Sequence, residues 1–141
     1  MEWLLLAALS AFFAALVSIL AKIGLKGVDS TVATAARAVV MMLFIVVFAL
    51  STGKGSQLTQ FTNKDMGFII LSGVAGALSW LLYFAALELA DASKVAPVDR
   101  ASVLFVVVLA ALFLGEKITL KTATAGVLIF IGLMLLAVKL D

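Results

Sequence analysis

Five charge-free hydrophobic stretches, separated by short polar segments, fill most of the chain. They cover residues 3–21, 38–53, 66–87, 101–115 and 122–138. Crossing the roughly 30 Å hydrocarbon core of a bilayer takes about 20 apolar residues in a helix. The second and fourth stretches reach that length if their helices begin before the nearby charges, at about Thr31 and Val95. The pattern therefore predicts five spans, at about residues 3–22, 31–52, 66–88, 95–114 and 121–139.

These spans define an all-α, polytopic transmembrane helix bundle, and an odd number of spans places the two termini on opposite sides of the membrane. Residues 1–141 form a single five-helix domain, because no linker is long enough to divide the chain. The acidic start, Met1-Glu2, is unlike the basic start of a signal peptide, so we expect the first helix to be retained.

Residues with strong end-of-helix preferences mark the boundaries of the spans. Asp29 precedes the second helix as an N-cap candidate, and Thr62 with Asp65 matches a capping box before the third. Gly115 follows the fourth helix, where a left-handed glycine commonly ends a helix, and Thr119 precedes the fifth. The connections are therefore expected to be short turns.

Composition agrees with a membrane protein. The chain is 65% hydrophobic and only 13% charged, against about 25% charged residues in a soluble domain. It contains neither Cys nor His, so disulfides, thiolate metal sites and His-based catalysis lose their commonest components. We expect no catalytic residues, no metal site, no cofactor and no nucleic-acid partner; the expected partners are membrane lipid and a small molecule.

Basic residues are divided almost evenly between the two sides of the expected bundle. Positive charge in short loops normally sets orientation, because basic loops stay on the cytoplasmic side. Either the chain inserts in both orientations, or a few loop charges do not settle the question; both readings stay open. The side that holds the N-terminus carries Lys54, Lys64, Lys117 and Lys121, and the other side carries Lys22, Lys26, Lys94 and Lys139 together with Arg37 and Arg100.

Three charges lie inside expected spans rather than in loops. They are Arg37 in the second span and Asp99 and Arg100 in the fourth. Charges at such depth are costly and usually face a cavity or a partner, although a long arginine can also reach the interface. For Arg37 both readings stay open. Asp99 is too short to reach far, so a wet vestibule or a basic partner, Arg37 or Lys94, is expected for it.

The third span carries the clearest polar stripe. Ser72, Gly76, Ser79 and Tyr83 fall on one helical face, and Trp80 lies beside them. Such a stripe suits close packing of helices through small residues. It also suits the lining of a substrate cavity, which the aromatic residues near the middle of the span favour. We keep all five as cavity-lining candidates with Arg37, Asp99 and Arg100.

Several of these segments together resemble the EamA domain of the drug/metabolite transporter superfamily, in its short five-helix bacterial and archaeal form. The matching segments are residues 22–25 (Lys-Ile-Gly-Leu), Arg37, residues 92–97 (Ala-Ser-Lys-Val-Ala-Pro), residues 114–119 (Leu-Gly-Glu-Lys-Ile-Thr), residues 126–129 (Gly-Val-Leu-Ile) and Gly132. One departure is Phe12-Phe13, where longer members often carry Trp-Gly in the first helix.

The resemblance implies a transporter of small metabolites or drugs in the cell (plasma or inner) membrane of a bacterium or archaeon. It implies two copies acting as a homodimer by alternating access. Related small multidrug transporters use a glutamate within the first helix, but here no acid lies between Glu2 and Asp29. That proton-coupled mechanism is therefore not expected.

Two classes of function remain from the sequence. The first is a homodimeric transporter, whose copies we expect to be antiparallel, because two halves of opposite topology commonly surround a midplane site. The second is a non-transporting membrane subunit or scaffold that assists a partner with lipid-linked substrates. A transporter needs a hydrated path in the bundle, whereas a scaffold can pack dry.

Overall fold

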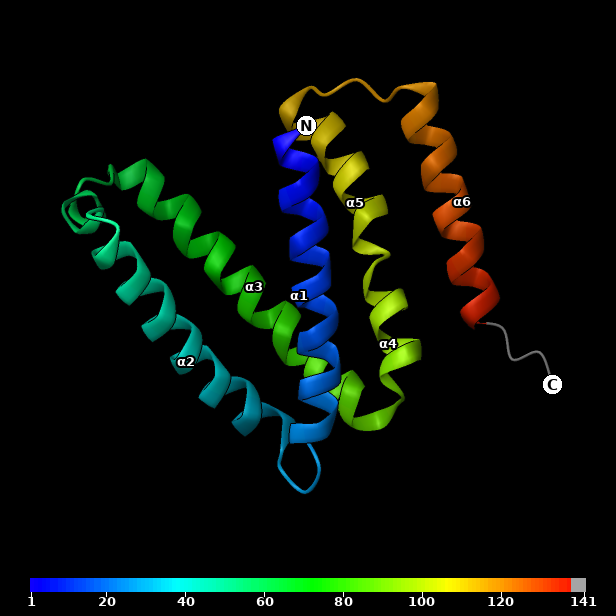
Figure 1. The fold of residues 1–141 in the computed structure, drawn as a ribbon. Helices are drawn as coiled ribbons and strands as arrows, with labels where there is room; N and C mark the ends of the chain where they lie inside the picture. The colour runs from blue at the N-terminus through cyan, green and yellow to red at the C-terminus, as the bar shows by residue number, and fades with distance from the viewer. Residues whose placement is uncertain (138–141) are drawn as a thin grey trace. The chain divides into compact units, whose positions relative to one another are not determined.

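The computed structural model describes residues 1–137, and every regular element within them is helical (Figure 1). The predicted all-α class is therefore confirmed for this part of the chain. In order, the elements are α1 (Glu2–Gly24), α2 (Ser30–Ser51), the 3₁₀ turn η1 (Gly55–Thr59), α3 (Asn63–Leu89), α4 (Ala92–Asp99), α5 (Ser102–Leu109), the π turn η2 (Ala110–Leu114) and α6 (Leu120–Ala137).

Within residues 1–137, four segments are long and apolar enough to cross a membrane. They are α1, α2, α3 and the stretch Ala92–Leu114, which contains α4, α5 and η2. A shorter apolar helix, Leu120–Leu136, follows. The end of the fifth predicted span, including Lys139, lies outside the described residues. A fifth crossing, and with it the opposite placement of the termini, stays a prediction.

The chain divides into two compact units, which are described separately. Ile19–Leu89 forms one unit, called here the α2–α3 unit. Met1–Ser18 and the chain from Ala90 onward form the other, called the α4–α6 unit. Helix α1 contributes its first part to one unit and its last turn to the other.

In the α2–α3 unit, α2 and α3 pack against each other as a helical hairpin around the η1 connection (Figure 1). The predicted caps are present. Asp29 Oδ1 accepts from the backbone N–H groups of Thr31 at 2.9 Å and Val32 at 3.0 Å. At the start of α3, Thr62 and Asp65 form the reciprocal hydrogen bonds of a capping box.

Lys22 ties the end of α1 to the end of α3 within the same unit. Its Nζ donates a hydrogen bond to the carbonyl oxygen of Leu87. A cation suits this position, because the last carbonyls of a helix carry partial negative charge. Leu87 is fully buried and Phe84 is 3% exposed, so these few residues supply much of the unit's small apolar core.

In the α4–α6 unit, α4 and α5 both pack on α6. Gly126 of α6 lies close to α5, where a Cβ added to it would be in ordinary van der Waals contact with Leu104 Cδ2, at 3.5 Å. Gly115 ends η2 with φ = 69°, a conformation that favours glycine. Thr119 Oγ1 then accepts from the N–H of Thr122 at the start of α6. The predicted roles of Gly115 and Thr119 are confirmed.

The single helix predicted for residues 95–114 is broken. It starts earlier, at Ala92, and is interrupted at Arg100 and Ala101. Pro97 therefore lies inside α4, where its missing N–H and its ring disturb the helical ladder. One turn later the backbone tightens: Arg100 N bonds to Pro97 O and Ala101 N to Val98 O. Such three-residue spacing is typical of a local 3₁₀ turn.

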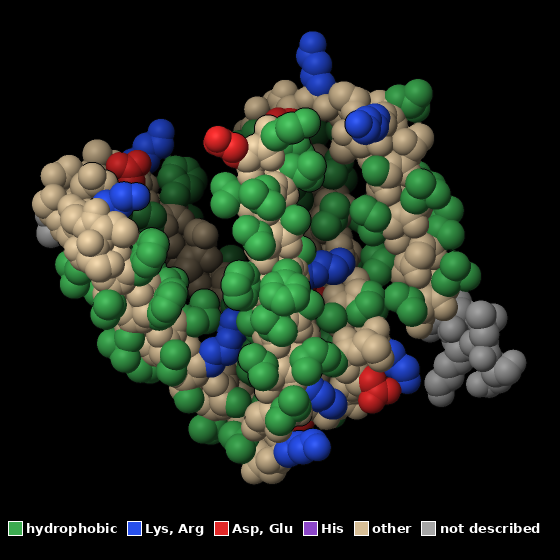
Figure 2. All heavy atoms as spheres, in the orientation of Figure 1, with side chains coloured by type: hydrophobic (Ala, Val, Ile, Leu, Met, Phe, Trp, Pro, Cys, Tyr) green, Lys and Arg blue, Asp and Glu red, His purple; other side chains and the backbone are tan. Residues whose placement is uncertain are grey.

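Apolar side chains cover the outer surfaces of the helices over most of their length (Figure 2). Phe44 and Leu82 are each 72% exposed. In water such a surface would aggregate, whereas in a bilayer it faces hydrocarbon of the same polarity. The surface thus agrees with a multi-pass membrane protein.

Candidate functional site

A groove of about 750 Å³ lies between α2 and α3. We call it the Arg37 groove. One face of each helix lines it, with residues recurring every three or four positions. From α2 these are Thr31, Thr34, Ala35, Arg37, Ala38, Met41, Met42 and Ile45; from α3 they are Gly73, Gly76, Ala77, Trp80 and Leu81.

Arg37 lies against the aromatic residues of α3. Its guanidinium carbon is 3.6 Å from the centroid of the Trp80 ring and 5.3 Å from that of Phe84. A guanidinium over an aromatic face is held by the ring's quadrupole, by about 0.5–2 kcal/mol depending on desolvation. Arg37 lines the groove in this geometry, and its role in binding stays a prediction.

The aromatic residues of α3 form a cluster that fixes the Trp80 ring. Trp80 is 5.8 Å from both Tyr83 and Phe84, with interplanar angles of 86° and 64°. These residues meet because side chains three and four positions apart share a helix face. Tyr83 and Phe84 are buried, so the cluster provides a rigid base under Arg37.

The groove floor is made of small residues. A Cβ added at Gly73 or Gly76 would have no atom within 4 Å, so no described part of the α2–α3 unit packs closely there. Gly76 thus lines the groove, and both readings of the α3 stripe stay predictions.

Polar groups in the groove are few. Thr34 Oγ1 donates to Ser30 O at 2.7 Å, which commits its proton to the helix backbone. Arg37 is the one charged residue among the described lining residues. Within Ile19–Leu89, no carboxylate lies at ion-pair distance from it.

The structure places the sequence-derived candidates of α3 in different surroundings. Gly76 and Trp80 line the groove. Ser72 and Ser79 are exposed, and Tyr83 is buried beneath Trp80. A functional role for these last three stays a prediction.

Sequence reasoning missed the α2 side of the groove. The recurrence of Thr31, Thr34 and Ala38 at spacings of three and four places small side chains on one face of α2. That spacing, opposite the glycines of α3, could have indicated a groove between the two helices.

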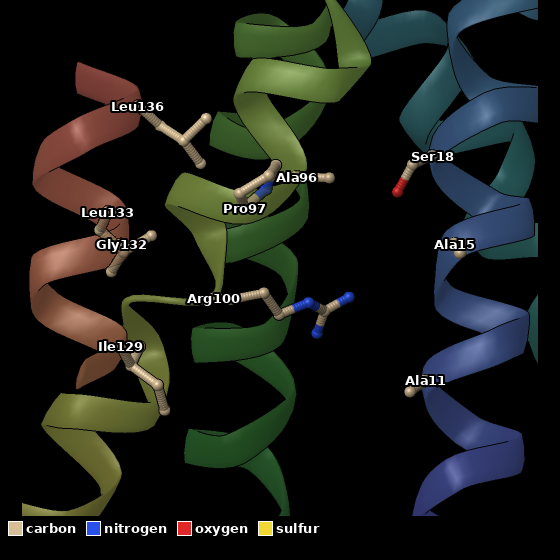
Figure 3. Close-up of a pocket in the computed structure, with 10 residues that line it drawn as sticks. All are labelled: Ala11, Ala15, Ser18, Ala96, Pro97, Arg100, Ile129, Gly132, Leu133 and Leu136. Atoms are coloured by element: carbon tan, nitrogen blue, oxygen red, sulfur yellow. The ribbon is translucent and has the colours of Figure 1, made fainter. Parts of the chain in front are cut away.

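A second cavity, of about 490 Å³, lies within the α4–α6 unit. The Arg100 side chain extends across it from the break between α4 and α5, towards α1 (Figure 3). Arg100 is its one charged residue among the described lining positions. The others are Ala11, Ala15, Ser18, Ala96, Pro97, Ile129, Gly132, Leu133 and Leu136.

Asp99 is half-buried beside the same break. Lys94, one of its expected partners, instead lies 3.4 Å from Asp91 Oδ2, and both of these side chains are highly exposed. The pairing of Asp99 with Arg37, in the other unit, stays a prediction. Within residues 1–137, no group of three His, Cys, Asp or Glu side chains is arranged to hold a metal.

Long apolar helices, a lipid-compatible surface and grooves bearing single arginines define a helical multi-pass membrane protein. The chain belongs to the EamA-like transporter family, whose model matches residues 1–138. This places it among membrane transporters.

A curated relative matches the chain over nearly its full length. The chain is 40% identical over 137 residues to the "Uncharacterized transporter in cobO 3'region" of Sinorhizobium sp., and the alignment covers 97% of each protein. No solved structure matches the chain.

Proposed function

We propose that the protein transports small metabolites across a bacterial or archaeal plasma membrane, as a homodimer working by alternating access. The observation that carries this proposal is the Arg37 groove. It sets an arginine and an open, small-residue floor between two long apolar helices. A charge inside such segments typically marks a substrate pathway.

The antiparallel arrangement of the two copies belongs to the same proposal. Transporters commonly combine two repeats of opposite topology around one site. A chain with one such repeat can reproduce this only by pairing with an inverted copy. The near-balance of basic residues between the two sides, four lysines on each with Arg37 and Arg100 added on one, is compatible with insertion in both orientations.

The interruption of the helix at Arg100, between α4 and α5, supports a change of conformation during transport. Discontinuous helices commonly form transporter binding sites, because unwound backbone there faces a cavity rather than lipid. Arg100 and Pro97 both line the cavity beside the break, so a change of angle between α4 and α5 would reshape that cavity.

The test is uptake into proteoliposomes, with a panel of radiolabelled amino acids, carboxylic acids, nucleosides and amines, against empty liposomes. Gly76→Leu fills the groove floor without changing charge, so it should abolish any uptake found. Gly67→Leu is the matched control on α3, because Gly67 also faces open space but lies outside the groove.

Uptake that survives Gly76→Leu would show that the groove is not the path. If no member of the panel is taken up by well-folded protein, the proposal of transport loses its support for those classes, and the scaffold reading becomes the one to pursue.

A further inference from the structure

The Arg37 groove carries a positive charge that its own unit does not balance. No carboxylate is among the described residues that line it, and none within Ile19–Leu89 pairs with Arg37. Charge inside a membrane-spanning segment is costly unless it is compensated. The groove therefore has a standing electrostatic preference for a negative group.

The stacking on Trp80 decides which part of Arg37 is free to bind. One face of the guanidinium is covered by the ring, 3.6 Å away. The N–H donors of an arginine point outward in the guanidinium plane, as a fork that matches a carboxylate or a phosphate in two-point geometry. Arg37 donates to no acceptor in its own unit, so this fork is available to a ligand.

The remainder of the groove is apolar. Met41, Met42, Ile45 and Leu81 line it beyond the arginine, and methionine adapts readily to ligands of varied shape. The volume, about 750 Å³, lies within the roughly 300–1,000 Å³ usual for small-molecule sites. A ligand that fills the groove must therefore combine one anionic group with an apolar body.

We propose that the Arg37 groove binds amphipathic organic anions. The anionic group is held by the N–H fork of Arg37, and the apolar or aromatic body lies along Met41 and its neighbours. This inference rests on the proposed transport function and names its substrate class. A cationic ligand would meet the like charge of Arg37 with no acid to offset it.

The cavity of the α4–α6 unit shares one feature with the Arg37 groove, a single arginine among mostly apolar lining residues. Arg100 is its one charged residue among described lining positions, and every other lining side chain but Ser18 is apolar. Ser18 Oγ donates to Ala14 O at 3.0 Å, as Thr34 does to its own helix. Each unit thus has a largely apolar cavity with one arginine, which is available to bind an anion.

Tryptophan fluorescence provides a direct test, because the chain has two tryptophans and Trp80 lies under Arg37. In a Trp3→Phe background all tryptophan emission comes from Trp80. The protein is reconstituted in neutral phosphatidylcholine vesicles and titrated with 4-bromophenylacetate, whose bromine quenches on contact. The isosteric 4-bromophenylacetamide and 4-bromophenethylammonium are titrated in parallel.

The expected result is saturable quenching by the carboxylate, with the amide and the ammonium binding about tenfold more weakly or worse, as loss of a charged hydrogen bond implies. Arg37→Gln should remove this preference. Arg37→Lys should keep part of it, because the charge remains but the planar fork does not. Lys54→Gln removes the same charge from an exposed connection of the same unit, and should change nothing.

Equal quenching by the three ligands, or no saturable quenching by the carboxylate, would overturn the proposal. In the second case a lipid phosphate is the better partner for Arg37. The comparison of the three ligands uses protein with an unchanged groove, so it tests the proposal even if Arg37→Gln fails to fold. Since quenching is read at equilibrium without a gradient, its outcome is separate from that of the uptake assay.

Discussion

At the scale of single residues, Gly115 is the position where the backbone most clearly dictates the side chain. Its φ of 69° ends the π turn η2, and a Cβ added there would meet no atom within 4 Å. Any effect of substitution therefore arises from backbone conformation rather than from a clash. A substitution of Gly115 therefore measures the free-energy cost of the backbone conformation without a cost from packing.

We expect Gly115→Ala to destabilise the folded protein by about 1–2 kcal/mol, the cost of a left-handed conformation for an L-residue. Gly115→Asn should cost less, because asparagine tolerates this region. Thermal unfolding in detergent micelles measures both. Gly67→Ala is the matched control: Gly67 is helical with open space around it, so alanine there should be neutral or stabilising. Equal losses at the two sites would show that φ at Gly115 is not the cause.

The candidate site was only partly predictable from sequence. Arg37 was recognisable because a charge inside an apolar span is rare. Trp80 was recognisable from its mid-span position. Their stacking was not predictable, because it depends on how α2 rotates against α3. Periodicity identifies a helix face but not the neighbouring helix that this face contacts. Ser72 and Ser79 therefore share a predicted face with Gly76. Of these three residues, Gly76 lines the groove, as Trp80 does beside it.

At the scale of elements, two aspartates at helix starts offer a controlled comparison. Asp29 caps α2 through two hydrogen bonds to Oδ1. Asp91 occupies the same position before α4, but makes no side-chain cap bond; its carboxylate instead pairs with exposed Lys94. Asp29 and Asp91 thus have the same side chain and the same charge at equivalent helix positions, but Asp29 bonds to the helix N-terminus and Asp91 to a lysine.

Asp29→Ala should therefore lower stability by about 1 kcal/mol, the usual cost of losing an N-cap. Asp91→Ala should cost only a few tenths of a kcal/mol, because exposed ion pairs contribute little. Chemical unfolding of the two variants in the same micelles provides the comparison. A loss at Asp91 as large as that at Asp29 would contradict the assigned caps.

The break between α4 and α5 leads to a second prediction for elements. If Pro97 causes the tightening at Arg100 and Ala101, Pro97→Ala should restore a continuous helix. Hydrogen exchange of the backbone amides of residues 100–104 should then slow, whereas Val98→Ala, an exposed neighbour, should leave it unchanged. Unaltered exchange in Pro97→Ala would assign the break to residues other than the proline.

Helix ends were predictable where a specific residue defines them, as at Asp29, Thr62 and Gly115. The break at Arg100 was not predictable, because the residues that follow it include neither Gly nor Pro up to Gly115 and continue the apolar stretch. The earlier start at Ala92 moved Pro97 from the tolerant first turn into the helix interior. A shift of three residues in one boundary thus decides whether the proline is a tolerated first-turn residue or one that disturbs the helix interior.

At the scale of the whole molecule, the orientation of the chain in the membrane is the decisive question. The chain has no native cysteine, so single cysteines report sidedness cleanly. Exposed positions without such a contact are preferable to Gly55, where a Cβ would lie 2.8 Å from Leu50 Cδ2 and the leucine side chain would have to shift. Gln57 in the α2–α3 connection and Lys26 in the α1–α2 connection are both exposed and lie at opposite ends of α2.

For dual insertion we expect about half of each cysteine, Gln57→Cys and Lys26→Cys, to react with an impermeant maleimide in intact cells, since both orientations are then equally populated. A single orientation gives full labelling of one and none of the other, which would remove the support for an antiparallel dimer. Each variant thus serves as the other's control, with permeabilised cells defining full labelling.

The division of the chain at residues 18 and 90 has a consequence for biogenesis. The α2–α3 unit is one uninterrupted segment, so all of its parts have left the ribosome once residue 89 has emerged. The other unit joins Met1–Ser18 to segments made last. Since chains are synthesised at about 5–20 residues per second and units assemble as they become complete, residues 1–18 of α1 meet the other segments of their unit only at the end of translation.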